Sequence, residues 1–83
     1  MRKASKKNKE MMMNPIKQLR VARKISMRDL ADQIDTTSQA IYHWEHGSKP
    51  TYDKLLAIAK VFSCDIEELS EDLIRWNELR KED

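Results

Sequence analysis

Side chains that form directional hydrogen bonds gather in one short stretch near the middle of the chain. The Gln39 amide both donates and accepts, the pattern that can pair with N6 and N7 of adenine, and the Ser38 hydroxyl can bond to several base edges. If this stretch is a helix with Ile41 and Trp44 turned to the core, its outer and flanking surfaces are polar. Those surfaces would then carry Ser38, Gln39, Tyr42, His43 and His46.

A catalytic or metal-binding use of this stretch lacks the accompanying residues. His43 and His46 are three residues apart and could be combined with Cys64, but the sequence has no CxxC pair or further ligand cluster. Ser, His and Asp residues occur without a nucleophile elbow or a glycine-rich loop. We therefore expect no enzyme and no bound metal or cofactor.

Length and composition indicate one small helical domain. The chain has 83 residues with one glycine and two prolines, and its β-branched residues do not form alternating runs, so an all-α fold is expected. The longest apolar run, Leu55 to Ala59, is far shorter than a membrane span, and the basic N-terminus lacks the apolar segment of a secretory signal. The single cysteine, Cys64, fits a reducing environment, so we expect a cytoplasmic protein.

Charge is unevenly distributed along the chain, although the net charge is only +2. Residues 1–24 contain nine Lys/Arg and one Glu, whereas residues 65–83 contain three Lys/Arg and eight Asp/Glu. Such a molecule has one end attracted to phosphate and the other repelled by it. We expect residues 1–13 to form a disordered basic tail, which either follows a nucleic-acid backbone or is a solvated leader.

Capping signals predict five helices. The expected helices cover residues 14–24, 26–34 and about 38–46, followed by two that begin at residues 51 and 65. Their starts are marked by Asn14 before Pro15, Ser26 with Asp29 three residues later, Thr51 and Asp65. Gly47 ends the third helix, because helix ends favour a residue in left-handed backbone. Beyond Ser70 the last helix either continues or restarts.

One set of positions stands at a characteristic joint spacing. The set comprises Arg20, Asp29-Leu30-Ala31, Thr37, Ile41, Glu45-x-Gly47, Pro50, Leu55, Ile58, Ala59, Phe62 and Leu69. Over Ile16 to Leu69 the chain thereby resembles the lambda-repressor/Cro-like (Xre-like) helix-turn-helix family. The resemblance implies a five-helix DNA-binding domain over residues 14–69. Residues 70–83 would then form an acidic C-terminal helix or tail, either an extension or an extra helix.

The resemblance also implies which side chains would meet DNA. In that family the first two residues of the third helix and one a turn later commonly read bases, and Ser38, Gln39 and His43 hold those positions here. Arg20 and Glu45 stand where relatives often form an ion pair, which would hold the third helix from behind. Nearby side chains could bind phosphates and so set the register. These are Arg28, Thr37, Tyr42, Ser48, Lys49 and Lys54.

Two positions depart from the usual residues of that family. Asp35 stands in the turn where relatives usually have glycine. The place tends to need a positive φ, which Asp tolerates at a cost of about 1 kcal/mol. Met27 stands where many relatives carry a glutamine that orients the first base-reading residue, so this orienting contact is missing here.

The resemblance favours a sequence-specific DNA-binding transcriptional regulator. More narrowly, it suggests a small repressor of phage or mobile-element type that binds a two-fold operator as a homodimer. Leu69, Leu73 and Trp76 of the C-terminal helix either form the dimer surface or pack on the chain's own core. The alternative is an antitoxin or protein-interaction adaptor of the same fold, with Trp76, Ile74 and Leu79 as its working surface.

Overall fold

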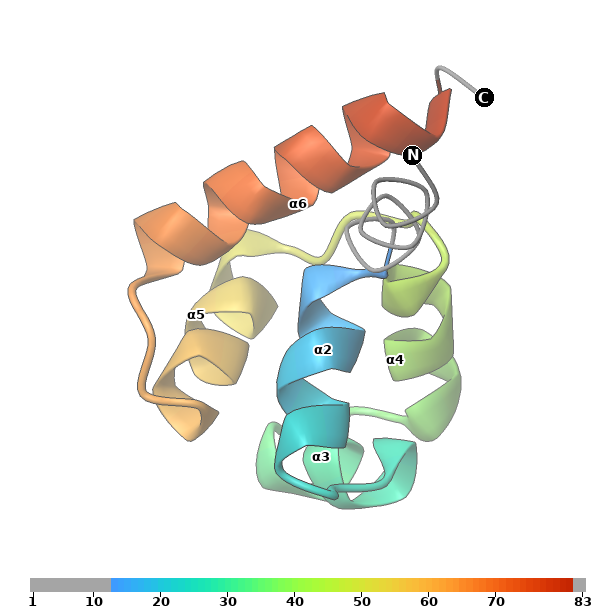
Figure 1. Cartoon of the computed structure of the whole chain (residues 1–83). Helices are drawn as coiled ribbons and strands as arrows, with labels where there is room; N and C mark the ends of the chain where they lie inside the picture. The colour runs from blue at the N-terminus through green and yellow to red at the C-terminus, as the bar shows by residue number, and fades with distance from the viewer. Residues whose placement is uncertain (1–12, 82–83) are drawn as a thin grey trace.

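Five helices make up residues 13–81, the part of the chain that this computed structural model describes (Figure 1). They are α2 (Pro15–Ala22), α3 (Met27–Gln33), α4 (Ser38–Glu45), α5 (Tyr52–Val61) and α6 (Ile66–Lys81). Residues 13–81 contain no strand, and the expected all-α class is confirmed. The basic tail expected over residues 1–13 lies outside the described residues except for Met13. None of the described helices has the length and apolar character needed to cross a membrane.

Each helix begins where a side chain caps its first free backbone N–H groups. Asn14 Oδ1 accepts from the N–H groups of the second and third residues of α2, at 2.8 and 3.2 Å. The hydroxyls of Ser26, Thr37 and Thr51 each accept from the N–H three residues further on. Asp65 Oδ1 accepts from the N–H two residues further on. These bonds satisfy donors that a helix start leaves unpaired, and they fix the starts where the sequence predicted them.

The first four helices share one kind of ending. Lys24, Asp35, Gly47 and Ser63 follow them in left-handed backbone, with φ of +57°, +60°, +118° and +55°. In each case the next residue donates its N–H to the carbonyl five residues earlier, at 2.9 to 3.0 Å. This bond satisfies a carbonyl that the helix itself leaves free. The expected positive φ at Asp35 is present, whereas Lys24 and Ser63 were not foreseen because neither is glycine.

The core is one cluster of apolar side chains to which all five helices contribute. Its completely buried members are Ile16, Leu30, Ile41 and Ile58, one each from α2 to α5. Trp44, expected to face inward, is half-buried and packs against this cluster. The inward side of α4 is therefore fixed by apolar contacts.

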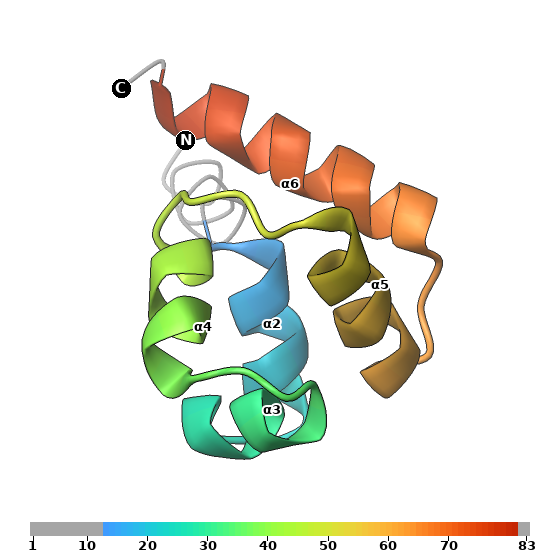
Figure 2. The same ribbon diagram turned by 180° about the vertical axis from the view of Figure 1, so that it is seen from behind.

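α2 stands between α4 and α5, and α6 runs across the ends of these three helices (Figures 1 and 2). α4 packs against α3 and α2, while α6 packs against α5 and α2. This arrangement leaves the other side of α4 facing away from the molecule.

α6 is one continuous helix of 16 residues that passes Ser70 without a break. Leu69 and Trp76 are buried in the chain's own fold, with 3% and 7% of their surface exposed, and Leu73 packs against the core. Two alternative roles were expected for these side chains, and in the structure they pack on the chain's own core. The expectation that Leu69, Leu73 and Trp76 offer a dimer surface, or Trp76 an adaptor surface, is corrected accordingly. Their apolar area is already used inside the molecule.

Candidate nucleic-acid interface

The outward side of α4 carries the polar side chains that the sequence places there. Ser38, Gln39 and His43 are all exposed. Ile41 and Glu45, on the opposite side, are buried. Since residues three and four apart share a face of a helix, the polar side chains form one stripe that begins at the N-terminal end of α4.

Two aromatic rings stack on this same stripe. The ring centroids of Tyr42 and His46 are 4.0 Å apart with a 27° angle between the planes, and both residues are exposed. His46 Nδ1 lies 2.7 Å from the Tyr42 carbonyl oxygen. Because a carbonyl only accepts, this contact assigns a proton to Nδ1. The sequence placed both rings on the outer surface, and their spacing of four residues was the signal for the stack.

An ion pair holds α4 from behind. Arg20 Nε donates to Glu45 Oε2 at 2.7 Å, and Arg20 Nη2 donates to Glu45 Oε1 at 3.1 Å. The Glu45 side chain is completely buried, and 12% of the Arg20 side chain is exposed. Arg20 Nη1 also donates to the Ile25 carbonyl at 3.0 Å. The guanidinium thus joins α2, the loop before α3, and α4, in the two-pronged geometry that arginine offers to a carboxylate.

A second buried polar side chain fixes the C-terminal end of α4. Asn14, which caps α2, is 2% exposed, and its Nδ2 donates to the Trp44 carbonyl at 3.3 Å. The two residues are 30 positions apart in the chain. The sequence indicated the cap, which is local, but contained no signal for this second contact.

The side chains expected to bind phosphate lie in three different settings. Arg28 and Ser48 are exposed. Thr37 caps α4 by accepting from the Ala40 N–H at 3.1 Å, and its hydroxyl proton can still be donated. Lys54 Nζ instead donates to the carbonyls of residues 34 and 35, each at 3.0 Å. Lys54 therefore closes the C-terminal end of α3, a role that sequence reasoning missed.

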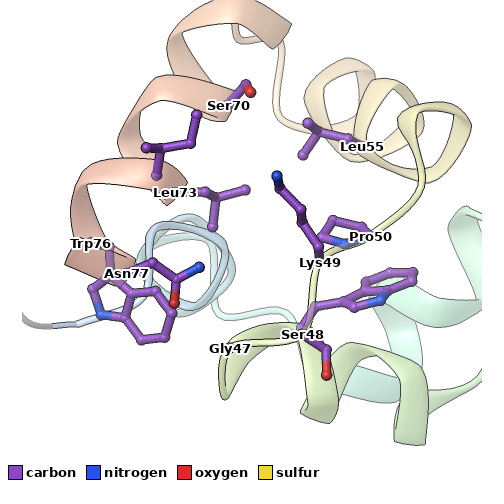
Figure 3. A pocket seen from close by; sticks show the side chains of 11 residues that line it. Gly47, Ser48, Lys49, Pro50, Leu55, Ser70, Leu73, Trp76 and Asn77 are labelled. Carbon is purple, nitrogen blue, oxygen red and sulfur yellow. The ribbon is translucent and has the colours of Figure 1, made fainter. Parts of the chain in front are cut away.

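Lys49 belongs to the loop between α4 and α5. Figure 3 shows its side chain reaching into a small cleft, with Leu55 of α5 on one side and Leu73 of α6 on the other. The cleft has a volume of about 60 Å³. In this position Lys49 is exposed and points along the cleft towards α5 and α6.

Cys64 lies in the loop between α5 and α6 and is partly buried. Burial raises the pKa of its thiol, with smaller contributions from the carboxylates of Glu68, Asp65 and Asp72, while Arg23 lowers it. A raised pKa keeps the thiol protonated and hence a weaker nucleophile. Its contribution to stability is complete below the pKa of the unfolded chain and is lost as the pH rises through the folded-state value.

Comparison with known proteins agrees with this geometry. A family described as Helix-turn-helix, of the Xre/lambda-repressor-like type, matches residues 16–69. The chain belongs to this family of DNA-binding regulators. No curated protein and no solved structure matches the chain.

Proposed function

We propose that the protein is a sequence-specific transcriptional repressor, of the type found in phages and mobile elements, that places α4 in the major groove of a two-fold operator. The exposed polar stripe of α4, with Ser38 and Gln39 at its N-terminal end, carries this proposal. Binding at a promoter would exclude polymerase. This function would place the protein in the cytoplasm with its DNA.

Gln39 is the main base reader in this proposal, with Ser38 and His43 in support. The Gln39 amide can form a two-pronged contact with adenine, which discriminates against a wrong base by about 1–3 kcal/mol. From Gln39 to His46 the stripe is about 10 Å long at 1.5 Å per residue, which spans about three base pairs.

Phosphate contacts would surround this stripe and set the register of α4 on the duplex. Arg28 and Ser48 are the proposed partners with exposed side chains, and the Thr37 and Tyr42 hydroxyls lie on exposed residues of the same segment. Lys49 and Lys54 would take part mainly through their positive charge, because their ammonium groups are directed elsewhere. Each phosphate that is neutralised steepens the log–log dependence of affinity on salt by about 0.9.

A two-fold operator requires two copies of the chain. With Leu69 and Trp76 buried, the apolar side chains that remain open to a second copy include Ile74 of α6 and Tyr52 of α5, which are 47% and 68% exposed. We propose a homodimer that uses this part of the surface.

The test begins with selection of bound sequences from random duplex DNA. We expect a two-fold consensus and a complex that contains two chains. Gln39→Ala should then weaken binding to the selected site about tenfold or more and relax the preference at one base pair of each half-site. The salt dependence should stay unchanged, because no phosphate contact is lost.

Gln18→Ala serves as the matched control, because it makes the same chemical change on α2. Among the described residues, it removes one hydrogen bond, from Gln18 Nε2 to the Met13 carbonyl. Failure to select any sequence, or a Gln39→Ala protein that binds as tightly as the wild type, would refute the proposal.

The second candidate is an antitoxin or protein-interaction adaptor of the same fold. Ile74 favours it, since this apolar side chain of α6 is exposed and lines the cleft between α4, α5 and α6. In that case Ile74→Asp would abolish a stable complex with the partner, whereas Gln39→Ala would leave the complex intact.

A further inference from the structure

The last turns of α6 reach the C-terminal end of α4 through one arginine. Arg80 Nη2 donates to the His46 carbonyl at 3.4 Å, and the guanidinium lies over the Trp76 ring, 4.6 Å from its centroid. Arg80 Nε donates to Asn77 Oδ1 at 3.1 Å, which orients the guanidinium plane. We propose that Arg80 is a positioning residue that fixes the C-terminal end of α4 and so the angle at which α4 meets DNA.

Gly47 provides the space for this contact. A Cβ atom at residue 47 would overlap the Arg80 guanidinium, so any other side chain there would displace the arginine. The φ of +118° at Gly47 separately disfavours other residues. The only glycine of the chain therefore serves both the ending of α4 and the approach of α6.

Charge explains why an arginine suits this place. The C-terminal end of a helix carries partial negative charge, and a cation there is stabilising. The hydrogen bond to the His46 carbonyl is long, so this charge supplies much of the attraction to α4, while the cation–π contact with Trp76, on the same helix as Arg80, holds the guanidinium in place.

A cation from another element also binds the carbonyls at two other helix ends. Lys54 of α5 binds the last carbonyls after α3, and Arg23, after α2, donates to the Phe62 carbonyl that follows α5 at 3.1 Å. Arg23 also lies over the Phe62 ring, 5.3 Å from its centroid. Among the described residues, the Arg80 contact is thus one of three in which a cation from another element binds the carbonyls at a helix end.

Three separate contacts hold the end of α4. Asn14 binds the Trp44 carbonyl, the Ser48 N–H binds the His43 carbonyl at 2.9 Å, and Arg80 binds the His46 carbonyl. The family match ends at residue 69, so the Arg80 contact comes from a part of α6 outside it. Across the cleft in Figure 3, Trp76 and Asn77 face the loop that starts at Gly47.

The proposal rests on the function proposed above, and its test compares three variants on the selected DNA site. Arg80→Ala should weaken binding about three- to tenfold, with the salt slope unchanged, because a tilted α4 makes poorer base contacts while no phosphate contact is lost. Arg80→Lys should restore only part of the affinity, because an ammonium keeps the positive charge but lacks the planar group that stacks on Trp76.

Arg75→Ala is the matched control, since it removes the same charge from the same helix. Arg75 is exposed and pairs only with Asp72 among the described residues, at 3.5 Å. Its affinity should stay within about twofold of the wild type. Full rescue by Arg80→Lys, together with a salt slope reduced by about 0.9 in Arg80→Ala, would overturn the proposal by showing that Arg80 binds a phosphate directly.

Amide hydrogen exchange provides a readout that needs no DNA. Arg80→Ala should lower the protection of the Ser48 N–H, which closes α4, and leave that of Thr36 and Cys64, which close α3 and α5 by the same bond. Unchanged protection at Ser48 would overturn the positioning role. If the wild type selects no DNA sequence, the proposed function fails, and lower Ser48 protection still supports the contact between α6 and α4.

Discussion

The carboxylate of Glu45 is shielded from water, and Arg20 neutralises its charge. An ionised group costs several kcal/mol to remove from water, and its partner offsets that cost only when the geometry is good. Here two N–H groups of one guanidinium meet two oxygens of one carboxylate. The pair therefore ties α4 to α2 at one defined orientation.

Removing Arg20 should lower the free energy of unfolding more than removing the charge of Glu45. Arg20→Met leaves a buried carboxylate without its partner and should lower the free energy of unfolding by about 3–5 kcal/mol, measured by urea denaturation. Glu45→Gln should cost less, because Arg20 stays partly exposed and keeps its bond to the Ile25 carbonyl. The double variant Arg20→Met/Glu45→Leu should recover much of the free energy of unfolding that Arg20→Met loses. Equal stability of Arg20→Met and the wild type would contradict this reading.

At the residue scale, the sequence predicted contacts that relatives share or that neighbouring residues make. The Arg20–Glu45 pair followed from the resemblance, and the outward position of Gln39 followed from helical periodicity. The position of the Lys54 ammonium did not, because its carbonyl partners lie 19 and 20 residues away. No local sequence pattern distinguishes a lysine that binds the last carbonyls of another helix from one whose ammonium is available to bind a phosphate.

Three of the four helix endings place a residue other than glycine in left-handed backbone. A non-glycine residue in this conformation costs about 1–2 kcal/mol, yet three of the four endings have Lys24, Asp35 or Ser63 there. The hydrogen bonds that close each helix offset this strain. Free energy is therefore stored at these positions, and a glycine would release part of it.

Replacement of serine by glycine should have opposite effects at two sites. Ser63→Gly should raise the free energy of unfolding by about 0.5–1 kcal/mol, because φ at residue 63 is +55°. Ser70→Gly, the same change inside α6, should lower it by about 0.5 kcal/mol through reduced helix propensity. Thermal unfolding of both variants measures the difference. A loss of stability in Ser63→Gly would show that the ending is not strained.

At the element scale, helix starts were more predictable than helix ends. Starts depend on a capping side chain within three residues, as at Asn14, Ser26 and Thr51, and the sequence shows these directly. Ends at Lys24 and Ser63 depend on backbone conformation that no glycine marks. Whether α6 would fold back was open as well, since an apolar stripe suits either its own core or a second chain.

At the scale of the whole molecule, α6 joins the α5 side of the fold to the end of α4 (Figure 1). Its Leu69 belongs to the common core, while Trp76 and Arg80 extend the contact towards α4. The exposed acidic residues of α6, such as Glu71 and Glu78, repel phosphate from this side of the molecule. α6 thus supports the polar stripe of α4 from behind without belonging to it.

Removal of the second half of α6 should destabilise the entire domain. A chain that ends at Ser70 loses the burial of Trp76 and the packing of Leu73, and its free energy of unfolding should fall by at least about 3–5 kcal/mol. That is a large share of the stability of a small domain. Glu78→Ala, which changes an exposed side chain of the same segment, should shift it by about 0.5 kcal/mol or less. If the denaturant titrations of the shortened and full chains superimposed, the second half of α6 would contribute nothing to stability.

The two tryptophans of the chain, Trp44 on α4 and Trp76 on α6, line the same cleft. The intrinsic fluorescence of these two side chains therefore reports on the junction between α4 and α6. If α6 moved away from α4, water would reach the Trp76 indole and its fluorescence emission would shift to longer wavelength. Fluorescence of the unlabelled protein can follow that motion in real time, with Trp44 reporting from the inward side of α4.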